Sequence, residues 1–128
     1  MRGGFQMVAR FPYSVTTPKY FAVASEVATM ALLRSSGLSI PEVYGYSPVP
    51  DNAAETEYVF MEFVEGTNSS DIWFGLGEGD IVSISRQLAK LESKTMSIVF
   101  PAGGSLYYTK DLSCRVRRRG RTRDDEAE

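Results

Sequence analysis

The chain has 128 residues, of which 43% are hydrophobic and 23% charged, and its formal net charge is −2. This length and composition are typical of one small globular domain, and the weak negative charge does not favour a nucleic-acid partner. The sequence contains no histidine, which excludes Ser-His-Asp and Cys-His catalysis and histidine metal sites.

A single cysteine, Cys114, excludes a disulfide framework within the chain. We therefore expect an intracellular protein, either cytoplasmic or mitochondrial. The sequence has no run of 18 apolar residues, so we expect no membrane span.

The first predicted strand covers residues 5–11, where side chains alternate with period two. One side of this strand, which we expect to be the core side, carries Phe5, Met7, Ala9 and Phe11. Arg10 falls on the opposite side, where it would be available to a ligand.

A helix is predicted over residues 20–35, which contain neither glycine nor proline. Its small apolar residues recur at the spacing of one helix face, at Ala24, Val27, Ala28 and Ala31. Gly37 predicts the end of this helix.

Two further strands are predicted at residues 42–47 and 57–64, and the short connection between them favours an antiparallel pair. A short helix follows at residues 70–74, capped by Ser70 or Asp71. A longer one is predicted from an N-cap at Asp80 to about Met96. The order of elements predicts an α+β fold, in which one helix packs on a small antiparallel sheet and a mainly helical part follows.

The composition changes after Leu112. Residues 115–128 contain six arginines and four acidic residues and almost no apolar ones. We therefore divide the chain into a domain at residues 1–112 and a disordered arginine-rich tail at 113–128. The arginines could attract nucleic-acid phosphates, but no aromatic residue follows Tyr108 to stack on bases. Nucleic acid is therefore the least favoured partner.

Three local matches, at residues 8–12, at 24–30 followed by 40–45, and at 56–66, resemble in order and spacing the protein-kinase-like N-terminal lobe of the aminoglycoside phosphotransferase family. A weaker match lies at residues 104–107. The likeness is greatest to fungal phosphotransferase-like proteins of the altered-inheritance-of-mitochondria group. It implies a kinase-like N-terminal lobe followed by the first helices of an incomplete C-terminal lobe.

The resemblance also implies a nucleotide-binding site. Arg10 matches the strand residue that contacts the nucleotide phosphates, and Glu26 matches the helix residue that pairs with it. Met61 matches the gatekeeper behind the adenine pocket. The main-chain carbonyl of Glu62 and N–H of Val64 would hold the adenine edge. Without the resemblance, Arg10 is an ordinary strand arginine and Glu26 a solvated helix residue.

The family uses ATP and Mg²⁺ to phosphorylate a small-molecule hydroxyl, through a His-x-Asp loop, a later Asn and a metal-binding Asp. The absence of histidine removes the usual form of this loop, and only Gly3 and Gly4 stand where a phosphate-covering turn is expected. We therefore expect no catalytic residue, no metal ligand and at most weak nucleotide affinity. We therefore expect the chain to be a truncated gene product or a gene-model fragment.

A second interpretation is a non-catalytic interaction module or pseudokinase fragment. Without a C-terminal lobe, Trp73 and the apolar residues of the 80–96 helix would stay exposed. Such a surface favours a protein partner or self-association.

Overall fold

The structure is a computed structural model that describes residues 4–15 and 17–113. Its elements in chain order are β1 (Met7–Arg10), α1 (Lys19–Ser35), β2 (Val43–Ser47), β3 (Tyr58–Glu62), α2 (Ser69–Ile72), the 3₁₀ turn η1 (Trp73–Gly75) and α3 (Glu78–Met96). A last helical turn covers residues 109–113. The predicted α+β fold, with a small antiparallel sheet and several helices, is confirmed.

The three strands form one sheet in the order β1-β3-β2, and both neighbouring pairs are antiparallel. The predicted antiparallel pairing of the second and third strands is therefore confirmed. In the register of β1 with β3, Arg10 lies opposite Val59 and Val8 lies opposite Met61. Because paired residues of an antiparallel ladder point to the same side, all four side chains belong to one sheet face.

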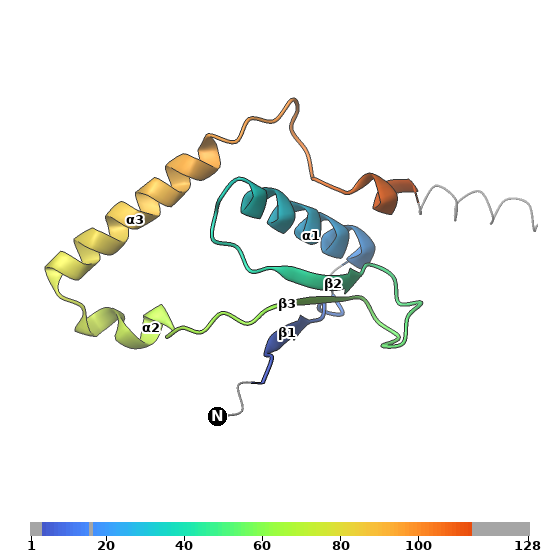
Figure 1. Ribbon diagram of the computed structural model, residues 1–128, viewed down its shortest axis with the longest axis horizontal. Helices are drawn as coiled ribbons and strands as arrows, with labels where there is room; N and C mark the ends of the chain where they lie inside the picture. The colour runs from blue at the N-terminus through green and yellow to red at the C-terminus, as the bar shows by residue number, and fades with distance from the viewer. Residues whose placement is uncertain (1–3, 16, 114–128) are drawn as a thin grey trace, which may run out of the picture.

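Helix α1 packs against β2 and β3 on that face, as Figure 1 shows. The centre of the core is formed by Val23 and Val27 of α1 and Val59 of β3, which are at most 3% exposed. This centre is surrounded by the partly buried side chains of Val43, Tyr46 and Met61. The buried positions Ala24, Val27 and Ala28 confirm the predicted apolar face of the helix.

The predicted core side of β1 is wrong. Phe5, Met7 and Phe11 are 74%, 52% and 51% exposed, and the strand covers only Met7–Arg10. The alternating pattern separates the two sides of the strand, but α1 covers the side that carries Val8 and Arg10. A period-two pattern separates two faces without saying which one a helix will cover.

Two helix starts also differ from the prediction. The cap of α2 is Asn68, whose side chain accepts a hydrogen bond from the Ser70 amide. Helix α3 begins at Glu78 and not after Asp80. Asp80 instead lies inside the first turn, where its carboxylate accepts a hydrogen bond from the Gly77 amide at 3.3 Å. An acidic residue stabilises either position, so composition alone does not separate them.

Helix α3 lies apart from the sheet in Figure 1. Its Lys94 ammonium donates to the Gly37 carbonyl at 2.5 Å. None of its residues is buried, and Leu88 and Leu91 are 59% and 49% exposed. No helix within residues 4–15 and 17–113 is long and apolar enough to cross a membrane.

The predicted boundary between the domain and the tail stays a prediction. Ser113 lies in the helical turn at 109–113. The rest of the predicted tail, residues 114–128, lies outside the described residues.

Candidate functional site

Arg10 and Glu26 form an ion pair between the end of β1 and the middle of α1. The guanidinium Nη1 donates to the Glu26 carboxylate. Arg10 reaches the helix because it shares a sheet face with Val59, the residue against which α1 packs. The pairing that the family resemblance implies is therefore present. The predicted role of the pair in binding a nucleotide stays a prediction.

The ion pair lies at the rim of the core and not inside it. The side chains of Arg10 and Glu26 are 61% and 31% exposed. A hollow of about 140 Å³ adjoins them and is lined by Arg10, Phe11, Pro12, Tyr13, Ala22, Val23, Glu26 and Val59. An exposed guanidinium that is held by a single carboxylate oxygen keeps donors for a phosphate or carboxylate ligand.

The other predicted site residues lie at the far end of β3. Met61 is partly buried and packs against the core cluster, and its gatekeeper role stays a prediction. Glu62 is the last residue of the strand, and Val64, in the segment that leaves the sheet, is 63% exposed. Arg10 lies opposite Val59, three residues before Glu62, so the two ends of the site are roughly 10 Å apart along the strand.

The lining of the hollow beside Arg10 offers the carboxylate of Glu26 as a possible magnesium ligand. Within residues 4–15 and 17–113, no three acidic or cysteine side chains gather closely enough to hold a metal ion. Mg²⁺ in nucleotide sites is usually held by one or two carboxylates together with the phosphates. Glu26, the acidic residue nearest the hollow, is already engaged by Arg10, so no step is assigned to a metal here.

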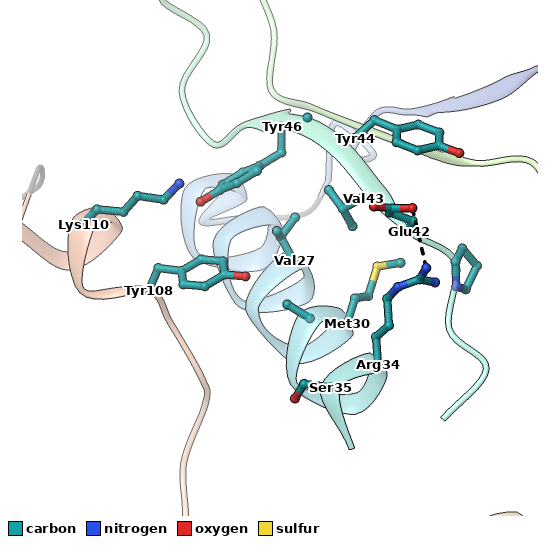
Figure 2. A pocket seen from close by; sticks show the side chains of 13 residues that line it. Val27, Met30, Arg34, Ser35, Glu42, Val43, Tyr44, Tyr46, Tyr108 and Lys110 are labelled. Carbon is teal, nitrogen blue, oxygen red and sulfur yellow. Dashed lines mark ion pairs between the residues drawn. The ribbon is translucent and has the colours of Figure 1, made fainter. Parts of the chain in front are cut away.

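A second hollow, of about 550 Å³, lies between α1, β2 and the segment that contains Tyr108 and Lys110 (Figure 2). The Lys110 ammonium lies 4.9 Å from the centre of the Tyr46 ring and 5.3 Å from that of Tyr108. Tyr46 donates to the carboxylate of the buried Asp111 at 2.9 Å. These contacts tie the C-terminal segment to the sheet.

The surroundings of Tyr46 and Lys110 shift the pKa of both side chains. Burial raises the pKa of Tyr46, Lys110 lowers it and Asp111 raises it again, with a net rise. The hydrogen bond to Tyr46 raises the pKa of Lys110. The positive charge of Lys110 is offset by the neighbouring carboxylate of Asp111. The positive charge of Arg34, at the other end of the hollow, is offset by the carboxylate of Glu42. Arg34, Glu42 and Lys110 are the charged residues that line the hollow, whereas the buried Asp111 lies outside its lining.

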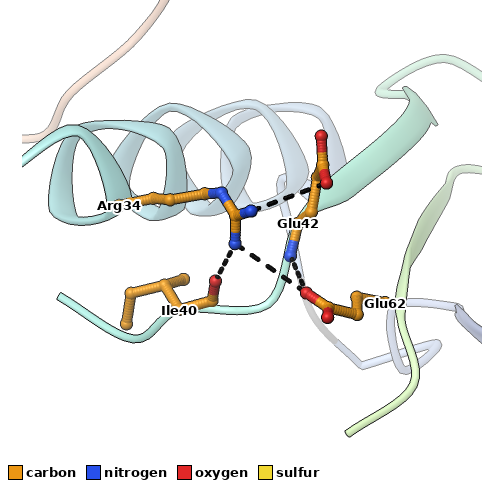
Figure 3. Close-up of polar contacts among 4 residues, drawn as sticks. All are labelled: Arg34, Ile40, Glu42 and Glu62. Atoms are coloured by element: carbon orange, nitrogen blue, oxygen red, sulfur yellow. Dashed lines mark hydrogen bonds and ion pairs between the residues drawn. The ribbon is translucent and has the colours of Figure 1, made fainter. Parts of the chain in front are cut away.

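Sequence reasoning missed a polar cluster at the end of β3. Arg34, in the last turn of α1, donates to the Ile40 carbonyl at 2.7 Å. Its guanidinium also lies 3.5 Å from the Glu42 carboxylate and 3.8 Å from that of Glu62 (Figure 3). A surface arginine and two surface glutamates give no sequence signal, because charged residues are common at helix ends and strand ends.

The chain is similar to fungal proteins that are much longer. It is 42% identical over 112 residues to the subtelomeric hrmA-associated cluster protein of Aspergillus fumigatus, a match that covers 87% of this chain and 22% of the relative. The protein named altered inheritance of mitochondria protein 9, mitochondrial, of Meyerozyma guilliermondii is 32% identical over 117 residues. Its namesake in Lodderomyces elongisporus is 29% identical over 132 residues.

These two matches cover 88% and 96% of this chain but 19% and 21% of the relatives. The chain therefore spans about a fifth of the length of the curated relatives it matches. The predicted likeness to the fungal altered-inheritance-of-mitochondria proteins is confirmed. No family model matches the chain. No solved structure matches it either, so the kinase-like assignment stays a prediction.

Proposed function

We propose that this chain is the nucleotide-contacting N-terminal lobe of an aminoglycoside-phosphotransferase-like, kinase-fold protein. The observation that carries the proposal is the Arg10–Glu26 ion pair, which joins a strand to helix α1, packed on the sheet. In a kinase-like lobe, this pair holds the basic residue that contacts the nucleotide phosphates.

The position of Met61 supports the same proposal. Met61 shares a sheet face with Arg10 and packs on the core directly before Glu62 and the exposed segment that follows. A bound ATP would place its phosphates near Arg10 and its adenine edge along the main chain of Glu62 and Val64.

The chain alone binds ATP weakly and does not transfer its phosphate. Transfer needs a residue that orients the acceptor hydroxyl and groups that hold Mg²⁺. The sequence has no histidine for a His-x-Asp loop, and the described residues contain no cluster of three acidic or cysteine side chains that could hold a metal ion. A complete protein of this class would phosphorylate a small-molecule hydroxyl. Because relatives carry the word mitochondrial in their names, we propose the mitochondrion as the place where this protein acts.

Isothermal titration with Mg²⁺ and ATP tests the proposal. We expect weak binding by the wild type, and loss of at least tenfold in affinity for Arg10→Ala. Arg86→Ala is the matched control, because Arg86 is an exposed arginine of α3, away from the sheet, and this variant should bind like the wild type. The absence of ATP binding by the wild type, or ATP consumption that survives Arg10→Ala, would overturn the assignment.

A second candidate function, an interaction module, is favoured by the apolar surface of α3 and the turn before it. Trp73 is 43% exposed and Phe74 is 98% exposed. Leu88 and Leu91 of α3 are exposed as well, and exposed apolar surface favours binding to a partner or self-association. We expect the 14.2 kDa chain to elute as a larger species in size-exclusion chromatography, and Leu88→Gln to shift it toward the monomer. A clean wild-type monomer argues against this function.

A further inference from the structure

Arg34 joins three parts of the fold at the end of β3, as Figure 3 shows. One guanidinium nitrogen, Nη1, donates to the Ile40 carbonyl at 2.7 Å and lies 3.8 Å from the Glu62 carboxylate. The other, Nη2, lies 3.5 Å from the Glu42 carboxylate. The planar fork of arginine can serve several acceptors at fixed angles, which a lysine ammonium cannot do.

Glu62 makes several polar contacts within this cluster. Its carboxylate accepts a hydrogen bond from the Glu42 amide at 3.0 Å, and its own amide donates to the Glu42 carbonyl at 2.8 Å. These bonds continue the pairing of the sheet to the end of β3. The end of β3, from which the chain continues toward Val64, is therefore in contact with both Glu42 and Arg34.

Both ends of the proposed nucleotide site are thus tied to the same helix. Glu26 of α1 holds Arg10, where the phosphates would lie, and Arg34 of α1 holds Glu62, where the base would lie. The two helix residues are eight positions apart, which is about 12 Å along the helix axis. A rigid helix that holds both ends fixes the distance between them.

We propose that Arg34 is a positioning residue that sets the base-contacting main chain of Glu62 and Val64. This inference rests on the proposed function, since it assumes that this segment receives the base. Arg34 touches no nucleotide itself and acts through Glu62. Its side chain is 47% exposed, and the carboxylates of Glu42 and Glu62 are 55% and 43% exposed. Exposed ion pairs of this kind contribute little to stability, so removal should alter the site more than the fold.

The preference of the protein for one nucleotide base over another can be measured, and a merely structural role of Arg34 would not change it. The amino group of adenine donates a hydrogen bond where hypoxanthine has an oxygen acceptor. A fixed carbonyl of Glu62 would therefore bind ATP in preference to ITP. Inorganic tripolyphosphate probes the Arg10 end alone, because it has no base.

The experiment is an NMR titration of ¹⁵N-labelled protein with ATP, ITP and tripolyphosphate. The wild type should prefer ATP over ITP by roughly tenfold, the discrimination that one hydrogen bond commonly provides. Arg34→Gln should lose most of this preference and keep its tripolyphosphate affinity. Arg10→Ala should lose tripolyphosphate affinity, and Arg86→Gln should behave like the wild type.

The outcomes separate this inference from the function on which it rests. If the wild type prefers ATP and Arg34→Gln keeps the full preference, the positioning role is wrong while the proposed function stands. The positioning role is also wrong if Arg34→Gln weakens the binding of tripolyphosphate and of ATP by the same factor. If the wild type binds none of the three ligands, the proposed function fails and this inference fails with it.

Discussion

Arg10 and Glu26 are sixteen residues apart in the sequence, yet they meet across the rim of the core as an ion pair. The register of β1 with β3 makes this meeting possible, because it places Arg10 opposite Val59 on the face that α1 covers. Had the register slipped by one residue, Arg10 would point to the open face of the sheet and the pair could not form.

The first prediction separates the function of this pair from its contribution to stability. Since both side chains are partly exposed, Arg10→Ala should lower the free energy of unfolding by less than about 1 kcal/mol. Urea unfolding, followed by circular dichroism, measures this change, with Arg86→Ala as the control. A loss of more than about 3 kcal/mol would mean that the pair is a buried structural one, and lost ATP binding would then be an effect of unfolding.

The second prediction concerns the centre of the core. Val59 is 1% exposed and packs on Val23 and Val27, so Val59→Ala should cost about 2 kcal/mol through lost burial and the cavity left behind. Val99 is 91% exposed, and Val99→Ala should change the stability by less than about 0.5 kcal/mol. Equal urea midpoints for these two variants would contradict the proposed position of the core.

The third prediction concerns the turn after α1. Gly37 has φ of +78°, and a Cβ added there would lie 3.1 Å from the Lys94 ammonium. Gly37→Ala should therefore destabilise the chain by about 1 kcal/mol, the usual cost of a left-handed conformation in a residue with a side chain. Gly66 has open space around it, so Gly66→Ala serves as the control. A thermal midpoint for Gly37→Ala at or above that of the wild type would contradict this conformation.

The fourth prediction is a pH dependence that arises from Tyr46. Its pKa in the folded state is raised above the ordinary value of 10.0, so the folded state holds the phenol proton more tightly than the unfolded one. The stability due to this group is complete below pH 10 and is lost as the pH rises toward the folded-state pKa. Lys110, whose pKa is also raised from 10.5, acts with the same sign.

Urea midpoints at pH 8 and at about pH 11 measure this effect, with Tyr46→Phe as the comparison. The wild type should lose more stability between these two pH values than Tyr46→Phe, which has no phenol to titrate. A loss in Tyr46→Phe equal to that of the wild type would show that Tyr46 is not the group responsible.

Most of the fold could be predicted from the sequence because its elements have strong local signals. The Gly- and Pro-free run with a small apolar face predicts α1, and the aromatic and β-branched residues around Val59 predict β3. What the sequence could not supply was which face of β1 the helix would cover. That choice depends on the register with β3, which is a tertiary relationship and not a local one.

The candidate site was predictable to a different degree at its two ends. The pairing of Arg10 with Glu26 followed from the family resemblance, and the structure contains it. The cluster of Arg34, Glu42 and Glu62 was not predictable, because three exposed charged residues resemble any solvated surface until the fold brings them together. The nucleotide itself remains a prediction at both ends.

The central claim is that a nucleotide binds between Arg10 and the end of β3, and the most direct test is to map amide chemical-shift changes on addition of ATP. We predict that the largest changes fall on β1 near Arg10 and on the Met61–Val64 segment, and that they are much reduced in Arg10→Ala. Changes confined to α3, or no change at all at millimolar ATP, would contradict the claim.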